Sequence, residues 1–326
     1  MSITFKYTII HVLDLGLDMP IFSTNLFYLD DEVESFLTKH LTKVIQNQSS
    51  SLGVFKDNAL LPHILNSPLD VTSFIDLSKD LGEVFFKYMK EYQTLSSGDL
   101  ILTYFNQDSH DYLGILKLNY KEEYTHLVDN NSGGITTKII KHKSIFTNSS
   151  KSVEEAVIIK IEDLSTLVLD TTKSKYLTLL FDLDINPSIK ETIATIQKVA
   201  NKVIEEHYDN PVNAIVELKN NIADSIANTQ TIPIHNIMEQ TFGSDEQVFE
   251  SCITEMAQHG LNDLNIEVTD PKISNKFTSQ KIQTDTGIEV KFPSNIFKNP
   301  EFIEIINNPD GTLAIIIKNI SYITNK

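Results

Sequence analysis

Arginine is absent from this chain of 326 residues, and all 27 of its strongly basic residues are lysines. Arginine makes the bidentate contact to guanine on which much sequence-specific reading of the major groove depends, whereas lysine acts as a flexible point charge. If the protein contacts DNA, we therefore expect contacts to the phosphate backbone with little sequence preference. An AT-rich genome, which favours lysine, asparagine and isoleucine codons, explains the same absence without any function.

Cysteine and long hydrophobic runs are scarce as well. Cys252 is the only cysteine, which excludes internal disulfides and a zinc site built from several cysteines, and it falls on the apolar side of a predicted helix as a core thiol. No stretch approaches the roughly 18 apolar residues that a membrane span needs. The first 20 residues alternate like a strand and lack the basic region and cleavage site of a signal peptide. We therefore expect a cytoplasmic protein with no membrane contact.

Catalytic motifs are also missing. The chain has no Walker loop, no dinucleotide glycine fingerprint, no GxSxG elbow and no HExxH, and its nine histidines include no pair at i, i+4. We expect no catalytic residue, no metal and no cofactor. Asp285, Glu289 and Lys291 are the residue types that a metal-dependent nuclease uses on adjacent strands, and such a nuclease stays a remote alternative. Asp285 precedes Glu289 by only four residues, which leaves no room for a strand and its return.

The periodicity of the apolar residues predicts an α+β protein whose N-terminal antiparallel sheet has helices packed on it, over residues 1–185. One predicted helix begins after Asp30, which caps it, and a second spans about residues 71–93. The predicted strands and hairpins are 2–14 with 19–29, 98–107 with 111–121, 123–129 with 135–143 around the turn "NNSGG", and 154–161.

Charge is partitioned along the rest of the chain. Residues 186–262 read as an acidic helical region, and residues 205–270 hold 13 acids against the single lysine Lys219, in a chain of net charge −17. Residues 263–326 return to strands and end in a predicted hairpin around Pro309-Asp310-Gly311. We expect the acidic region to bind a protein partner or a second copy, or only to keep the protein soluble.

Two basic segments interrupt this acidity. Residues 136–151 carry four lysines and no acid, and residues 272–298 carry five lysines and two acids. Backbone recognition needs several lysines that reach phosphates together. The candidate DNA contacts are Lys138, Lys141, Lys143, Lys151, Lys272, Lys276 and Lys281. Lys141 and Lys143 share one strand face and Lys138 the other. The alternative is that these lysines solvate a sheet face or pair with carboxylates.

Four stretches, "YLGILKLNYKEEYTH" (112–126), "SKYLTLLF" (174–181), "KIQTDTGIEVKFP" (281–293) and "INNPDGTLAIIIKNI" (306–320), resemble the bacterial nucleoid-associated NdpA family, also called YejK-like. Their order and spacing fit across nearly the whole chain. The resemblance implies a cytoplasmic protein found with the nucleoid, without enzymatic activity, and linked to DNA and to the type II topoisomerases. It carries no functional residue over by position.

Three functional hypotheses remain, of which the metal-dependent nuclease, with cleavage lost in Glu289→Gln, is the remote one. The first is a nucleoid protein that binds DNA itself, which predicts steeply salt-dependent and sequence-tolerant binding. The second is an adaptor whose acidic helices dock on a basic partner, such as a type II topoisomerase or another DNA-binding protein, without touching DNA. A salt series with duplex DNA distinguishes the first two.

Overall fold

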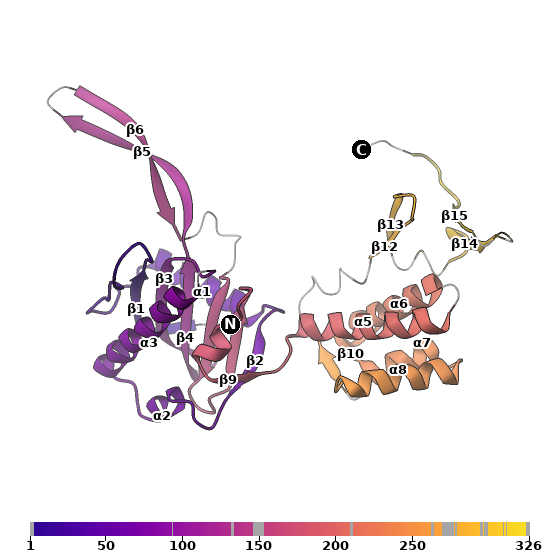
Figure 1. Cartoon of the computed structure of the whole chain (residues 1–326), viewed down its shortest axis with the longest axis horizontal. Coiled ribbons are helices and arrows are strands. Elements are labelled where there is room, and N and C mark those ends of the chain that lie inside the picture. Colours follow the sequence, from indigo (N-terminus) through magenta and orange to yellow (C-terminus); the bar gives the residue numbers. More distant parts are fainter. Residues whose placement is uncertain are drawn as a thin grey trace. The chain divides into compact units, whose positions relative to one another are not determined.

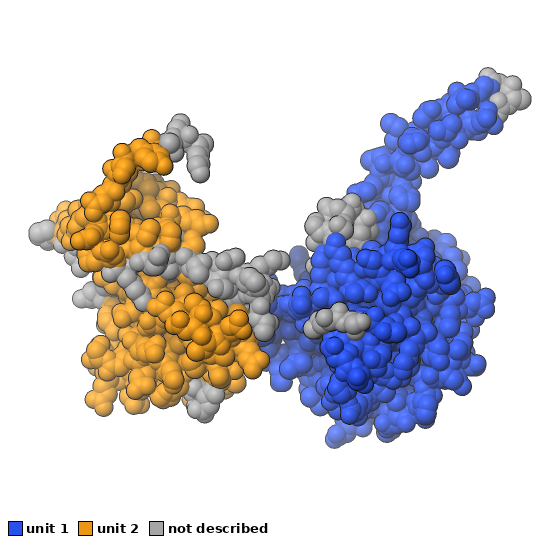
Figure 2. Space-filling model, turned by 180° about the vertical axis from the view of Figure 1, so that it is seen from behind, with its two compact units in different colours: residues 1–190 blue, residues 191–326 orange. Residues whose placement is uncertain are grey.

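The structure, a computed structural model, describes residues 3–92, 94–131, 134–145, 153–208, 211–261, 264–268, 277, 279–293, 296, 299–308, 310 and 312–323. The chain divides into two compact units, Met1–Lys190 and Glu191–Lys326, coloured separately in Figure 2. A further division of the second unit at residue 262 stays a prediction.

The first unit is built on one antiparallel sheet of seven strands, in the order β1-β3-β4-β7-β8-β2-β9. The strands are β1 (Ile3–Leu13), β2 (Ser51–Phe55), β3 (Gly98–Gln107), β4 (His110–Asn119), β7 (Glu155–Lys160), β8 (Thr166–Asp170) and β9 (Leu183–Ile185). This confirms the predicted α+β class. Strand β2 was not predicted: the sequence "SSSLG" was interpreted only as the end of the preceding helix, and the structure places the start of β2 there.

Both faces of the sheet are covered by helices. Alternate residues of β3 point to opposite faces, so Leu100 and Leu102 pack in the core with α3 (Val71–Glu91), while Ile101 and Phe105 pack with α1 (Asp31–Ile45). The predicted cap of α1 is confirmed, because the Asp30 carboxylate accepts a hydrogen bond from the Val33 amide at 2.9 Å. Two short helices complete the unit, α2 (Leu61–Leu65) and α4 (Leu177–Leu180).

The prediction of a strand over residues 19–29 is wrong. The segment runs beside β1 as a loop, with one bridge between Ile21 and Val12. At Ser23 the backbone amide donates to His11 Nδ1 at 3.1 Å and the hydroxyl donates to the Ile10 carbonyl at 2.6 Å. Side-chain contacts therefore replace the regular ladder that the alternating sequence had predicted.

Strands β5 (Lys121–Asn131) and β6 (Gly134–Ser144) form a hairpin that projects from the first unit (Figures 1 and 2). The register is continuous from Lys121 opposite Ser144 to Asn131 opposite Gly134. Among the described residues these two strands pair only with each other. We call this hairpin the arm; its sequence pattern predicted it correctly.

Helix α5 (Ile189–His207) begins at the end of the first unit and continues into the second. The second unit also contains α6 (Pro211–Thr229), α7 (Ile234–Phe242) and α8 (Glu246–Gln258), with the strands β10 (Thr231–Pro233) and β11 (Asn265–Glu267). Two hairpins follow, β12 (Ser279–Gln283) with β13 (Glu289–Pro293) and β14 (Ile303–Asn307) with β15 (Leu313–Ile317). The predicted C-terminal hairpin is confirmed. In the described part of the chain, no helix has the length and apolar character needed to cross a membrane.

A candidate nucleic-acid interface on the arm

Strand β6 holds three of the candidate DNA-binding lysines, and each contacts a carboxylate. Lys138 Nζ lies 3.5 Å from Asp129 Oδ2 and Lys141 Nζ lies 2.9 Å from Glu122 Oε2. The side chains of Lys138 and Lys141 are 58% and 62% exposed. Exposed ion pairs contribute about 0–1 kcal/mol, so a phosphate can replace either carboxylate at little cost.

Lys143 lies near the root of the arm, the end at Lys121 and Ser144 where the hairpin leaves the sheet, and its partner is outside the arm. Its ammonium pairs with the carboxylate of Asp14 and lies 5.4 Å from the centre of the Tyr120 ring. The hydrogen bond from Lys143 is the main cause that lowers the pKa of Asp14. Asp14 also accepts a hydrogen bond from the Ser97 hydroxyl at 3.2 Å. Lys143 therefore joins the arm to the loop after β1, whereas Lys138 and Lys141 pair with carboxylates of the arm itself.

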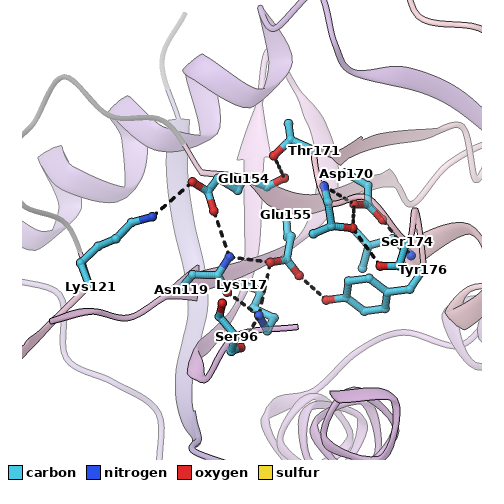
Figure 3. A network of polar contacts seen from close by, with 12 residues as sticks. Ser96, Lys117, Asn119, Lys121, Glu154, Glu155, Asp170, Thr171, Ser174 and Tyr176 are labelled. Atoms are coloured by element: carbon cyan, nitrogen blue, oxygen red, sulfur yellow. Dashed lines mark hydrogen bonds and ion pairs between the residues drawn. The ribbon is translucent and has the colours of Figure 1, made fainter. Parts of the chain in front are cut away.

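Below the root, a buried polar network joins the ends of β4 and β7, the strands between which the arm is inserted (Figure 3). Lys117 Nζ donates to Glu155 Oε1 at 3.3 Å and to the Ser96 carbonyl at 2.9 Å. The Asn119 amide donates to Glu155 Oε1 at 2.6 Å and to Glu154 Oε2 at 3.1 Å. The network therefore fixes both ends of the insertion.

Burial shapes the electrostatics of this network. Lys117 and Glu155 are each 1% exposed, and the Tyr176 hydroxyl donates to Glu155 Oε2. Burial lowers the pKa of Lys117, while the attraction of Glu155 acts in the opposite direction. Burial also raises the pKa of Tyr176, and the charge of Glu155 adds to that rise. Lys117, Glu155 and Tyr176 are closed off from water and bonded within the network, so this part of it offers no access to a substrate.

Asp170 extends the polar network to β8, where it lies opposite Glu155 in the strand register. Its carboxylate accepts hydrogen bonds from the amides of Thr172 at 3.0 Å and Leu177 at 3.1 Å. These bonds fix the turn that leads into α4. Sequence reasoning missed the whole network, although Lys117 and Glu155 interrupt apolar strands at positions that face the core.

The remaining candidate lysines lie outside the arm in the sequence. Lys281 belongs to the second unit, on β12, where Nζ lies 2.6 Å from Glu289 Oε2. Lys151, Lys272 and Lys276 lie outside the described residues. The structure thus brings together Lys138, Lys141 and Lys143 on one strand.

Asp285 and Glu289, two of the residues that suggested a metal-dependent nuclease, have other partners in the structure. Asp285 Oδ1 accepts a hydrogen bond from the Thr286 amide at 2.9 Å in the turn between β12 and β13, and Glu289 pairs with Lys281. Within the part of the chain that the structure describes, no group of three His, Cys, Asp or Glu side chains is placed to hold a metal ion. The remote nuclease alternative therefore gains no support from the geometry.

The acids of the helical region lie on its surface. The exposed carboxylates include Glu205, Glu206, Glu217, Glu239, Asp245, Glu246 and Glu250. Two of them, Glu206 on α5 and Glu250 on α8, line a hollow of about 310 Å³, together with His207 and the half-buried Glu255. Lys202 on α5 pairs with Glu255, with Nζ 3.2 Å from Oε1.

The fold and the arm together define an α+β protein with a helix-covered antiparallel sheet, a projecting lysine-bearing hairpin and an acidic helical unit. Residues 9–324 match the sequence profile of the NA37 family, described as nucleoid-associated protein YejK. The match covers nearly the whole chain, and the protein belongs to this family of nucleoid-associated proteins. The resemblance seen in the sequence is confirmed. No curated protein matches the chain.

Proposed function

We propose that this protein binds duplex DNA at the cytoplasmic nucleoid through the arm, with little sequence preference and without catalysis of its own. The observation that carries the proposal is the presentation of Lys138 and Lys141 on a projecting ribbon, on a strand that contains no carboxylate. A two-stranded ribbon is narrow enough to enter the major groove, where its lysines reach the phosphates on either side. The absence of arginine favours backbone contact over base reading.

The net charge of −17 limits the affinity of this contact. Carboxylates elsewhere on the surface repel the phosphate backbone, and salt screens attraction and repulsion alike. Each phosphate neutralised adds about −0.9 to the slope of log K against log salt. Two lysines on the arm therefore predict a slope near −2 for one copy of the chain.

Fluorescence anisotropy of a labelled duplex at low salt tests the proposal. The variant Lys138→Ala/Lys141→Ala removes the two exposed arm lysines that pair within the arm, and Lys39→Ala/Lys56→Ala removes the same charge from exposed lysines elsewhere in the first unit. We expect the arm variant to bind at least about tenfold more weakly and to lose nearly 2 from the slope, while the control keeps the native slope. Equal weakening in both variants would assign the effect to net charge and remove the arm from the account.

A second candidate function rests on the acidic surface of the helical unit. We propose that the hollow between α5 and α8 receives basic side chains of a protein partner, such as a type II topoisomerase. Glu206 and Glu250 are exposed at its edge, where incoming lysines or arginines can pair with them.

Binding of a purified type II topoisomerase, followed by interferometry over a salt series, tests this second function. The variant Glu206→Gln/Glu250→Gln should weaken binding, while Glu217→Gln/Glu239→Gln, which changes the charge equally outside the hollow, should not. No binding of the native protein at low salt would reject this function.

A further inference from the structure

One face of the arm is apolar and open to solvent. Tyr124 and Val128 on β5 are 72% and 53% exposed, and Ile135 and Ile139 on β6 are 73% and 79% exposed. The four side chains share a face because alternate residues point the same way and because Ile139 lies opposite His126, and Ile135 opposite Asn130. We call these four residues the apolar face of the arm.

Charges are few on the side of the apolar face. Among the described arm residues from Tyr124 to Ile139, the charged side chains are Asp129 and Lys138, which pair with each other on the opposite face. On the side of the apolar face, the nearest charges are Lys141, which lies opposite Tyr124, and Glu122, with which Lys141 pairs. Lys141 is therefore the one residue that this face shares with the DNA contact proposed above, and Lys138 lies on the other face.

The arm alone is a poorly stabilised element. An isolated hairpin of two strands is marginally stable in water, and an unpaired ribbon leaves both of its edges free. Exposed apolar clusters of this kind mark protein–protein contacts. The apolar face thus needs a protein surface that is apolar over the same length and carries charges only near the root.

A second copy of the arm has these properties. On the side of the apolar face the two strands differ in charge: β5 has Glu122, whereas β6 has Lys141 and Lys143 and no carboxylate. A two-fold axis parallel to the strands places the acidic β5 of one copy over the basic β6 of the other. The same operation brings Lys141 of each copy toward Glu122 of its partner.

We propose that two copies of this chain pair through the apolar faces of their arms, side by side and in the same direction about such an axis. The contact is isologous and closes on itself, as a two-fold dimer requires. It goes beyond the proposed function, because it involves no DNA. Its consequence for DNA is that Lys138, on the outer face, occurs twice in the dimer.

Sedimentation equilibrium without DNA tests the pairing. The variant Val128→Thr/Ile139→Thr makes the apolar face polar while it keeps β-branched residues that favour a strand. The control Leu127→Thr/Ile140→Thr makes the same kind of change on the opposite face of the same ribbon. We expect native and control proteins to be dimers and the apolar-face variant to dissociate at least about a hundredfold more readily. A monomeric native protein, or equal loss of dimer in both variants, would overturn the proposal.

Disulfide trapping tests the direction of the axis. The register places Val128 opposite Thr137 within one arm, so a parallel dimer sets Val128 of one copy over Thr137 of the other. Mixing the variants Val128→Cys and Thr137→Cys should therefore yield the mixed disulfide faster than either variant alone forms its own. The native Cys252 is buried and does not interfere. Faster self-linking of each variant would contradict the parallel arrangement.

Discussion

Lys117 on β4 and Glu155 on β7 are register partners in the sheet, and they form an ion pair with Nζ 3.3 Å from Oε1. Their side chains are 0% and 1% exposed. The pair lies where the chain leaves the sheet to form the arm and where it returns. The position of the arm therefore depends on an interaction inside the first unit as well as on the hairpin itself.

Removing one member of this pair should destabilise the protein strongly. Lys117→Met leaves the Glu155 carboxylate buried without its cation, and breaking a buried pair in this way costs about 3–5 kcal/mol. Lys121→Met, which removes an exposed lysine 3.4 Å from Glu154, should cost less than about 1 kcal/mol. Urea unfolding measures both. Replacing both partners, in Lys117→Met/Glu155→Leu, should recover part of the loss; equal costs for the two single variants would refute the role of the buried pair.

Acid should destabilise the protein through His11. Burial lowers its pKa from 6.5 to about 4, with Lys79 adding to the shift. Its ring accepts from the Ser23 amide at Nδ1 and donates from Nε2 to the Ser78 hydroxyl at 2.9 Å. Below pH 6.5 the unfolded chain binds a proton at His11 that the folded chain does not bind. The free energy of unfolding therefore decreases as the pH is lowered, until about pH 4.

The expected loss from His11 between about pH 7 and pH 5 is about 2 kcal/mol at most. It is measured as the difference between urea unfolding free energies at the two pH values. In His11→Gln this difference should shrink by the same amount, while the contribution of His40, whose pKa is also lowered to about 4 by burial, remains. An unchanged pH dependence in His11→Gln would show that His11 is not the group that titrates.

The thiol of Cys252 should be unreactive in the native protein. It is 0% exposed, and burial raises its pKa to about 12, with the nearby Glu255 adding to the rise. Because the thiolate is the reactive form, labelling by Ellman's reagent should follow only the opening of the helical unit and accelerate on addition of urea. Labelling at the rate of a free thiol without denaturant would contradict the packing of α8.

Lys143 should act on the root of the arm and only weakly on overall stability. Lys143→Met removes the partner of Asp14, so the pKa of Asp14, measured by NMR, should rise toward its ordinary value. Amides at the root of β6 should exchange faster, while the unfolding free energy changes by less than about 1 kcal/mol. Lys141→Met, the matched control, should leave the pKa of Asp14 unchanged; a shift there of similar size would show that Lys143 is not its specific partner.

Local features of the fold were predictable from the sequence. The arm follows from alternating residues on either side of the "NNSGG" turn, and α1 from Asp30 ahead of an amphipathic run. Residues 19–29 alternate as well but form a loop. Their backbone is held partly by His11, a partner that periodicity does not reveal.

The candidate site was predictable only in part. The lysines of β6 are adjacent in sequence, so a count of charges finds them. The contacts that anchor the arm are not local: Asp14 is separated from Lys143 by 129 positions, and Glu155 from Lys117 by 38. Such pairs are fixed by the strand order of the sheet. The sequence therefore indicated where the arm is, but not what anchors it.

The most direct test of the account is a lysine footprint of the native protein with and without a short duplex, by acetylation and mass spectrometry at low salt. The account predicts that DNA protects Lys138 and Lys141, while Lys39, Lys56 and Lys87, which are exposed elsewhere in the first unit, react as before. Protection of those other lysines with none on the arm, or no protection at all, would contradict DNA binding through the arm.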